Sequence, residues 1–218
     1  MKIVLSTRSM HPELTEKAQS LWDSCDFIDE YRQLKLRSDW EYLDDCIYNT
    51  DADLTISIDE DFFLIRPDVM EKIVEYIIEN DIEMVGPRTT TTDAPIIDNW
   101  FHISNNKLLK KCMPSVQDRV LLRVYSTPEY YKDVEFNDCF HGYDKHEFFF
   151  LLMVDRGCKF EFFSKNAVDF EILKTRGIDF GFHTRQGRDY NKKDIKKHID
   201  EVYDFVRSKY YEKHLNSS

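Results

Sequence analysis

Three acidic residues, Asp59, Glu60 and Asp61, follow directly after the stretch from Leu54 to Ile58. That stretch alternates between apolar and polar residues, which predicts a strand. Carboxylates two residues apart on an extended segment point the same way, so Asp59 and Asp61 are spaced to share one cation. Hard divalent cations such as Mg²⁺ prefer oxygen ligands and are often held by one or two carboxylates and substrate phosphates. The spacing therefore indicates a metal that clamps a diphosphate or, on the simpler interpretation, an acidic turn in contact with water.

The segments around these acids predict an α/β fold. Strands are expected at residues 2–7, 27–31, 54–58 and 84–86, and helices at 12–24, at 39–48 and from 67 onward. This alternation implies right-handed crossovers and a mostly parallel sheet flanked by helices. Ligands of open parallel sheets bind beyond the carboxyl ends of the strands, which is where the acidic residues would lie. A C-terminal amphipathic helix is expected over residues 191–214, and its lysine-rich face would contact either water or an anionic partner.

The composition narrows the possible classes of protein. The 218 residues suit a single domain, and all six glycines lie from Gly86 onward, which excludes a glycine-rich phosphate loop near the N-terminus. The five cysteines form no Cys-x-x-Cys pair and are expected to be reduced thiols. The longest apolar run, residues 148–154, is much shorter than the roughly 20 residues of a membrane helix. Without a signal-peptide core at the N-terminus, the chain is expected in the cytoplasm.

The net charge of −11 argues against a polyanionic partner such as nucleic acid. The charge is uneven, however, because residues 174–218 carry 11 Lys and Arg against 7 Asp and Glu. This basic segment weakens the argument without reversing it.

The stretch DLTISIDEDFFLIRPDVMEKIVEYI, residues 53–77, resembles the strand, Asp-x-Asp, loop and Pro-Asp helix of GT-A-fold glycosyltransferases. The resemblance implies a Rossmann-like sheet and a metal-dependent enzyme that moves a sugar from a nucleotide-diphosphate donor to an acceptor hydroxyl. It implies that residues 1–86 form the nucleotide-sugar-binding half, residues 87–190 the acceptor-side half and residues 191–218 a C-terminal helix of one domain. The metal, Mn²⁺ or Mg²⁺, would be held by Asp59 and Asp61. The expected contacts of the nucleotide sugar are Thr7, Arg8, Glu30, Asp59 and Glu60.

Two later segments extend the resemblance. FHGYDKHEFFFLLMVDRG, residues 140–157, is similar to the family's acceptor-side motif and would supply Asp144 or Glu147 as the catalytic base of an inverting enzyme. GFHTRQGR, residues 181–188, would bring His183 back to the metal as a nitrogen ligand, with Arg185 and Arg188 at the diphosphate. The simpler interpretations are that the acids carry charge in the first turn of a helix, where the dipole favours them, and that the histidine is structural.

Aromatic side chains between the two halves are candidates for acceptor contacts because their faces can stack on sugar rings. The expected residues are Trp100 and Phe101, with Tyr130 and Tyr131 as further candidates. The acceptor itself is not indicated by the sequence: a glycan, a protein, a small molecule and, with less support, a modified nucleic acid all stay open.

Two other functions remain possible from the sequence. A nucleotidyltransferase on a related sheet would also use acidic metal ligands, although such enzymes usually carry a glycine-rich or basic loop near the N-terminus, and Ser6 to Ser9 contain no glycine. A module that binds a nucleotide sugar without catalysis is the third possibility. A panel of nucleotide sugars would distinguish the three. Sugar transfer would indicate the glycosyltransferase, release of nucleotide without sugar transfer the nucleotidyltransferase, and binding alone the module.

The catalytic base provides a first prediction. Asp144→Asn is expected to keep donor binding but to slow transfer by roughly 10²–10⁴-fold, which is the usual contribution of a positioned base. Measurement of sugar transfer beside donor affinity checks it, and the product should show inversion at the sugar carbon. Retention of configuration, or near-normal transfer by both Asp144→Asn and Glu147→Gln, would contradict the assignment.

Overall fold

The computed structural model describes residues 1–35, 39–88, 97–98, 100–112, 150, 153, 156–167 and 171–211. Asp144, Glu147, Tyr130 and Tyr131 lie outside this part of the chain, so their predicted roles stay predictions. No helix in the described part is long and apolar enough to cross a membrane.

The described residues form a three-layer α/β fold around one nine-stranded sheet, with the strand order β2-β1-β3-β6-β5-β7-β8-β9-β4. The strands are β1 (Ile3–Ser9), β2 (Glu30–Lys35), β3 (Leu54–Asp59), β4 (Phe62–Leu64), β5 (Met84–Pro87), β6 (Phe101–Asn105), β7 (Phe160–Ala167), β8 (Glu171–Thr175) and β9 (Ile178–His183). The helices are α1 (Pro12–Ser20), α2 (Asp39–Ile47), α3 (Pro67–Glu79), α4 (Asn106–Cys112) and α7 (Lys193–Val206), with a 3₁₀ turn at Gly187–Asp189 and a π-helical turn at Arg207–Tyr211.

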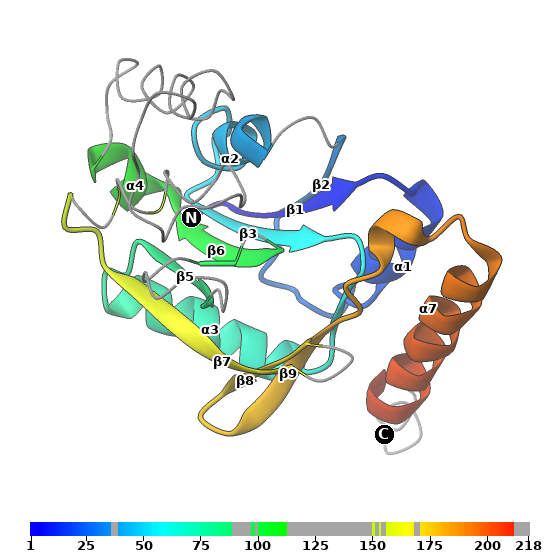
Figure 1. The fold of residues 1–218 in the computed structure, drawn as a ribbon. Coiled ribbons are helices and arrows are strands. Elements are labelled where there is room, and N and C mark those ends of the chain that lie inside the picture. Colours follow the sequence, from blue (N-terminus) through cyan, green and yellow to red (C-terminus); the bar gives the residue numbers. More distant parts are fainter. Residues whose placement is uncertain are drawn as a thin grey trace, which may run out of the picture.

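The helices cover both faces of the sheet. Figure 1 shows α2 and α4 on one side and α3 on the other. One hydrophobic core contains the buried side chains of α1, α3 and α7, and a second contains those of α2 and α4. Helix α7 is fixed beside α1, because Lys17 forms an ion pair with Asp200 at 2.5 Å and the Ser20 and Tyr203 hydroxyls lie 2.9 Å apart.

The prediction of a mostly parallel sheet is wrong, because the sheet is mixed. Strand β1 is parallel to β2 and β3, and β5 is parallel to β7, but β6 lies antiparallel between β3 and β5. Strands β7, β8, β9 and β4 then pair in antiparallel fashion. Short connections explain the antiparallel pairing of β8 with β7 and with β9, because parallel neighbours need a crossover of about a dozen residues or more. Between β8 and β9 the turn residues Arg176 and Gly177 have φ values of 47° and 79°, as in a tight type I′ hairpin.

Several element boundaries also differ from the prediction. The second strand was expected at residues 27–31 and lies at Glu30–Lys35, and the short strand β4 (Phe62–Leu64) was not predicted. The first helix ends at Ser20, and the C-terminal helix α7 is continued by the π-helical turn to Tyr211. Both Pro-led helices begin where predicted, with a proline in the first turn and an acidic residue, Glu13 or Asp68, beside it.

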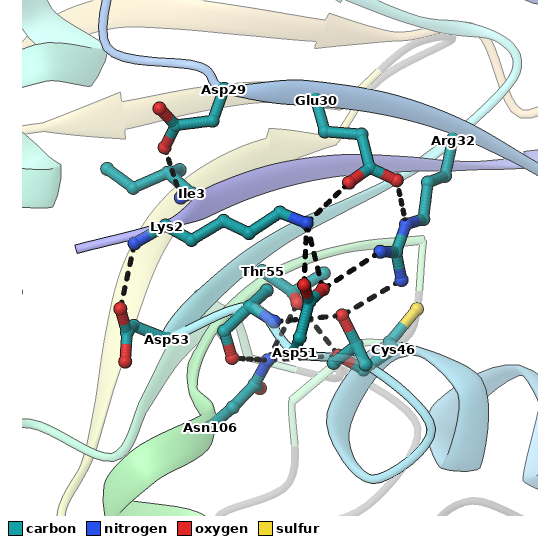
Figure 2. Close-up of polar contacts among 12 residues, drawn as sticks. Lys2, Ile3, Asp29, Glu30, Arg32, Cys46, Asp51, Asp53, Thr55 and Asn106 are labelled. Carbon is teal, nitrogen blue, oxygen red and sulfur yellow. Dashed lines mark hydrogen bonds and ion pairs between the residues drawn. The ribbon is translucent and has the colours of Figure 1, made fainter.

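The amino ends of β1, β2 and β3 are joined by a polar network (Figure 2). The Lys2 ammonium contacts Asp51 at 2.9 Å and Glu30 at 2.7 Å, and Arg32 contacts both acids from the other side. Hydrogen bonds from Arg32 and Lys2 lower the pKa of Glu30 to about 2. These exposed ion pairs lie at the edge of the sheet opposite to Asp59.

A buried amide, Asn106, links β3 to helices α2 and α4 near this network (Figure 2). Its Nδ2 donates to the backbone oxygens of Cys46 at 3.1 Å and Ala52 at 3.2 Å and lies 2.8 Å from Thr55 Oγ1. The Asn106 side chain is fully buried, so its removal would take a hydrogen bond from the Ala52 carbonyl and leave the Cys46 carbonyl and the Thr55 hydroxyl with their bond to each other, at 2.8 Å.

Asn106→Ala is therefore expected to lower the free energy of unfolding by about 2–4 kcal/mol, because a buried network loses the hydrogen bonds of the amide to Cys46, Ala52 and Thr55. Asn80→Ala is the matched control, since Asn80 is exposed and its side chain donates to the Tyr76 carbonyl at 2.9 Å. Chemical denaturation measures both variants, and equal losses would show that the buried amide network carries no special stability.

Candidate functional site

The carboxyl ends of β1 and β3 bring Arg8 and Asp59 together. The two residues are register partners in the parallel pair. Arg8 donates from Nε to Asp59 Oδ1 at 2.7 Å and from Nη2 to Asp59 Oδ2 at 2.8 Å, which is a bidentate ion pair. The guanidinium also lies over the Tyr42 ring of α2 at 5.5 Å. A cation and a carboxylate thus meet at the edge of the sheet where ligands of open α/β sheets bind.

Asp61 lies in the turn that follows β3, and its carboxylate is almost completely buried. Its Oδ2 accepts hydrogen bonds from the Thr184 hydroxyl at 2.6 Å and from the backbone N–H groups of Gln186 and Gly187, both at 3.0 Å. A Cβ atom on Gly187 would lie only 3.0 Å from Asp61 Cγ, so glycine allows the backbone to approach this closely. Asp61 Oδ1 is left facing His183.

His183 ends β9 and reaches Asp61 because β9 pairs with β4, where Phe62 is its register partner. His183 Nε2 lies 3.2 Å from Asp61 Oδ1, and Nδ1 lies 3.3 Å from Glu171 Oε2. One face of the imidazole stacks on Trp100, with centroids 4.2 Å apart and planes at 12°. The ring is therefore held on two sides, and Nε2 points at Asp61.

Electrostatics couple His183 to the acids. Burial alone would lower the pKa of His183, but the charge of Asp61 and hydrogen bonds to Asp61 and Glu171 raise it to about 10. Burial would likewise raise the pKa of Asp61, but His183 and the donors from Thr184 and Gly187 hold it well below its ordinary value. In the absence of metal, an imidazolium thus balances the buried carboxylate.

The residues present fit a divalent metal ion. Asp59, Asp61 and His183 each offer one ligand atom, and these atoms all lie within 4.8 Å of one another. Two carboxylate oxygens and one imidazole nitrogen are acceptable ligands for Mn²⁺-like ions, and Mg²⁺ takes the oxygens readily. A cation at this point would take the place of the proton on His183 Nε2 and share Asp59 with Arg8.

Other predicted donor contacts lie elsewhere. Glu30 is the register partner of Val4, four residues before Arg8, so it lies roughly 13 Å back along the strand in the ion pairs at the amino edge. Thr7 is fully buried, and its hydroxyl accepts a hydrogen bond from Gln19 of α1 at 3.1 Å. Alternation along β1 directs Thr7 and Arg8 to opposite faces, so only Arg8 faces the acids.

Glu60 points away from its two acidic neighbours and fixes the start of α1. Its Oε2 accepts hydrogen bonds from the backbone N–H groups of Met10 at 2.7 Å and His11 at 2.6 Å. Because the side chain is buried in these contacts, Glu60 anchors the loop before α1.

The structure buries the two aromatic candidates that it describes and leaves the two arginines exposed. Phe101 is fully buried and packs on Phe62 and Phe180, so it is a core side chain and not an acceptor contact. Trp100 is buried as well, and one of its faces is covered by His183. Arg185 and Arg188 are exposed after β9, and Arg185 Nη1 lies 3.9 Å from Glu171 Oε1.

Sequence reasoning missed Glu171, Lys165, Thr184 and Gly187. Glu171 is one acid at the start of a strand, and Lys165 is one base within another, so neither forms part of a motif. Thr184 and Gly187 lie within the segment that was singled out, but their donation to Asp61 depends on the path of the backbone after β9. Strand pairing reveals the contacts of Glu171 and Lys165, and the turn after β9 reveals those of Thr184 and Gly187.

No family model and no curated protein matches the sequence. The chain is similar to a solved glycosyltransferase involved in the glycosylation of the major capsid of PBCV-1, at 8% identity and a TM-score of 0.47, over 74% of this chain and 81% of that one. It is also similar to the glycosyltransferase GlyE of Streptococcus pneumoniae TIGR4, at 13% identity and a TM-score of 0.45, over 73% of this chain and 44% of that one. A third similar structure is CMP:2-keto-3-deoxy-manno-octonic acid synthetase complexed with CTP, at 10% identity and a TM-score of 0.48, over 96% and 100%.

Glycosyltransferases, which the sequence resembles, are thus among the solved structures similar to this chain. All three TM-scores lie below 0.5, so none of these likenesses assigns an activity to the chain.

The His183 ion pairs predict a pH dependence of stability without metal. Because the pKa of His183 rises from 6.5 to about 10 on folding, its charged form stabilises the fold below pH 6.5 and this contribution is lost as the pH rises towards 10. The loss is expected to be on the order of 2–4 kcal/mol. Chemical denaturation with a chelator at a series of pH values measures it.

In the His183→Gln variant, the free energy of unfolding should not show this fall between neutral and alkaline pH. The variant should also be less stable than the parent at pH 7. His198→Gln on α7 is the control and should follow the parent. If the free energy of unfolding of His183→Gln falls with pH as steeply as that of the parent, the charge of His183 does not stabilise the fold.

Proposed function

We propose that the chain is a metal-dependent glycosyltransferase that moves a sugar from a nucleotide-diphosphate donor to an acceptor hydroxyl. The observation that supports this most directly is the convergence of Asp59, Asp61 and His183 at the carboxyl edge of the sheet. These residues come from the end of β3, the turn after it and the end of β9, which is more than 120 residues further along the chain. An acidic turn in contact with water would not bury Asp61 or bring a histidine to it.

The balance of charge supports a divalent cation. The pair of Arg8 with Asp59 lies beside the ion pairs that join Asp61, His183, Glu171, Lys165 and Asp98, and together they contain four carboxylates and two basic side chains besides His183. With His183 neutral, this group carries two negative charges, which one divalent cation offsets. Arg185 is left out of this balance because its side chain is 59% exposed and its charge is screened by water.

The side chains around the acids suit a diphosphate. Bound Mn²⁺ or Mg²⁺ would supply electrostatic stabilisation of the leaving diphosphate, with Asp59, Asp61 and His183 as its ligands. Arg8 is paired with Asp59, while the exposed Arg185 and Arg188 follow His183 and could contact phosphate oxygens. Thr184, Gln186 and Gly187 hold Asp61 in one orientation, as a rigid site requires.

Nucleotidyl transfer is the second candidate function, and Arg8 is the observation that favours it. Nucleotidyltransferases usually carry a glycine-rich or basic segment near the N-terminus, and Arg8 supplies a guanidinium there, at the end of the first strand and beside the acids. The products separate the two reactions, because glycosyl transfer releases a nucleoside diphosphate and nucleotidyl transfer releases pyrophosphate. A panel of nucleotide sugars and of nucleoside triphosphates with sugar phosphates, each with Mn²⁺, tests both.

Asp61→Asn is expected to abolish metal-dependent binding of nucleotide diphosphate and to leave the fold intact. The amide oxygen can still accept from Thr184, Gln186 and Gly187, while the negative charge that favours the metal is lost. Calorimetric titration of UDP and GDP, with and without Mn²⁺, measures the effect.

Asp51→Asn is the matched control, because it removes the same charge at the opposite edge of the sheet, where the Asp51 side chain is 70% exposed. It should bind nucleotide as the parent does. If Asp61→Asn binds nucleotide as tightly as the parent with Mn²⁺ present, the metal assignment is wrong.

A further inference from the structure

Glu171 is directly opposite His183 in the antiparallel pair of β8 and β9. Register partners place their side chains on the same face of the sheet. Accordingly, Glu171 Oε2 lies 3.3 Å from His183 Nδ1, the nitrogen that does not face Asp61. Both side chains are less than 10% exposed. The contact is therefore fixed by the sheet itself and not by a loop.

Glu171 is held in turn by a buried lysine. Lys165 Nζ lies 3.1 Å from Glu171 Oε1 and 2.8 Å from Asp98 Oδ2, and its side chain is only 6% exposed. Each oxygen of Glu171 thus has its own partner, Lys165 for Oε1 and His183 for Oε2. This division fixes the plane of the carboxylate, because it cannot rotate without breaking both contacts.

The contacts restrict His183 to one useful orientation. Glu171 occupies Nδ1, Trp100 covers one face of the ring, and Nε2 is directed at Asp61. When the imidazole is neutral, a carboxylate at Nδ1 favours the tautomer with its proton there, which leaves the lone pair of Nε2 free for a metal. Carboxylates at the second nitrogen of metal-binding histidines orient the ring and raise its basicity.

We propose that Glu171 is the positioning residue that prepares His183 as a metal ligand, and that Lys165 holds Glu171 in place. This inference rests on the proposed metal site and adds to it two residues that no sequence motif marks. If Glu171 and Lys165 formed an ion pair for stability alone, Glu171 would not need to contact His183 as well. The register with His183 and the separate use of the two oxygens give Glu171 its further role.

Glu171→Gln tests the proposal, since it keeps the shape of the side chain and removes its charge. Lys165 keeps its contact with Asp98 in this variant, so the fold should persist. The affinity for Mn²⁺ alone, measured by the electron paramagnetic resonance signal of the free ion, is expected to fall by about 10–100-fold. Thermal unfolding in a chelator, recorded in parallel, separates loss of metal affinity from loss of stability.

Asp179→Asn is the matched control, because it removes a carboxylate from the same hairpin. Asp179 pairs with Lys174 at 3.0 Å, and its side chain is 42% exposed. This variant should bind Mn²⁺ as the parent does. If Glu171→Gln folds poorly, the double variant Glu171→Gln with Lys165→Gln replaces the ion pair by two neutral amides and should show the same loss of Mn²⁺ affinity.

The outcomes separate this inference from the proposed function. Parent-like Mn²⁺ affinity in a folded Glu171→Gln variant would overturn the positioning role and leave the metal site standing. A parent protein that binds no Mn²⁺ would overturn both the metal site and the role of Glu171. Weakened Mn²⁺ binding in the variant, with no sugar transfer by the parent from any nucleotide sugar, would support the positioning role and overturn the proposed reaction.

Discussion

The buried charge of Asp61 is the constraint on which the rest of the site depends. An ionised carboxylate removed from water costs several kcal/mol unless charged or polar partners replace the lost hydration. Here the partners are the Thr184 hydroxyl, two backbone N–H groups and the imidazole of His183. All of them come from the end of β9 and the turn after it, so this one charge joins the turn after β3 to the C-terminal part of the chain.

The packing around Asp61 makes that junction possible. Strand β4 is short and fully buried, and it pairs with β9 so that the Phe62 ring lies close to the backbone of Gly181. A Cβ atom on Gly181 would lie 2.3 Å from the Phe62 ring, and one on Gly187 would crowd the Asp61 carboxylate. After Gly187 the chain reaches Tyr190, whose hydroxyl donates to Asp200 at 3.0 Å beside Lys17. The same turn that satisfies Asp61 therefore also leads into the contact between α7 and α1.

The charged groups at the two edges of the sheet differ in how deeply they are buried. At the amino edge, Lys2, Glu30, Arg32 and Asp51 form ion pairs in contact with water, and exposed pairs of this kind contribute little to stability (Figure 2). At the carboxyl edge, the pairs of Asp59, Asp61 and Glu171 are mostly buried and include a histidine. Burial strengthens these interactions and raises the cost of leaving one of the charged groups unpaired.

The sequence by itself determined the alternation of helices with β1, β2, β3 and β5, because hydrophobic periodicity and the Pro-led helix starts are local signals. It also singled out Asp59, Asp61 and His183, which the structure brings close together. It did not determine the direction of β6 or the pairing of β4 with β9, since strand partners are chosen by packing between distant segments. For the same reason it could not show that the side chains of Glu30, Glu60 and Phe101 lie away from Asp59 and Asp61. Glu171 and Lys165 became visible only in the tertiary structure, because a register across two strands, and not a spacing along the chain, sets them beside His183.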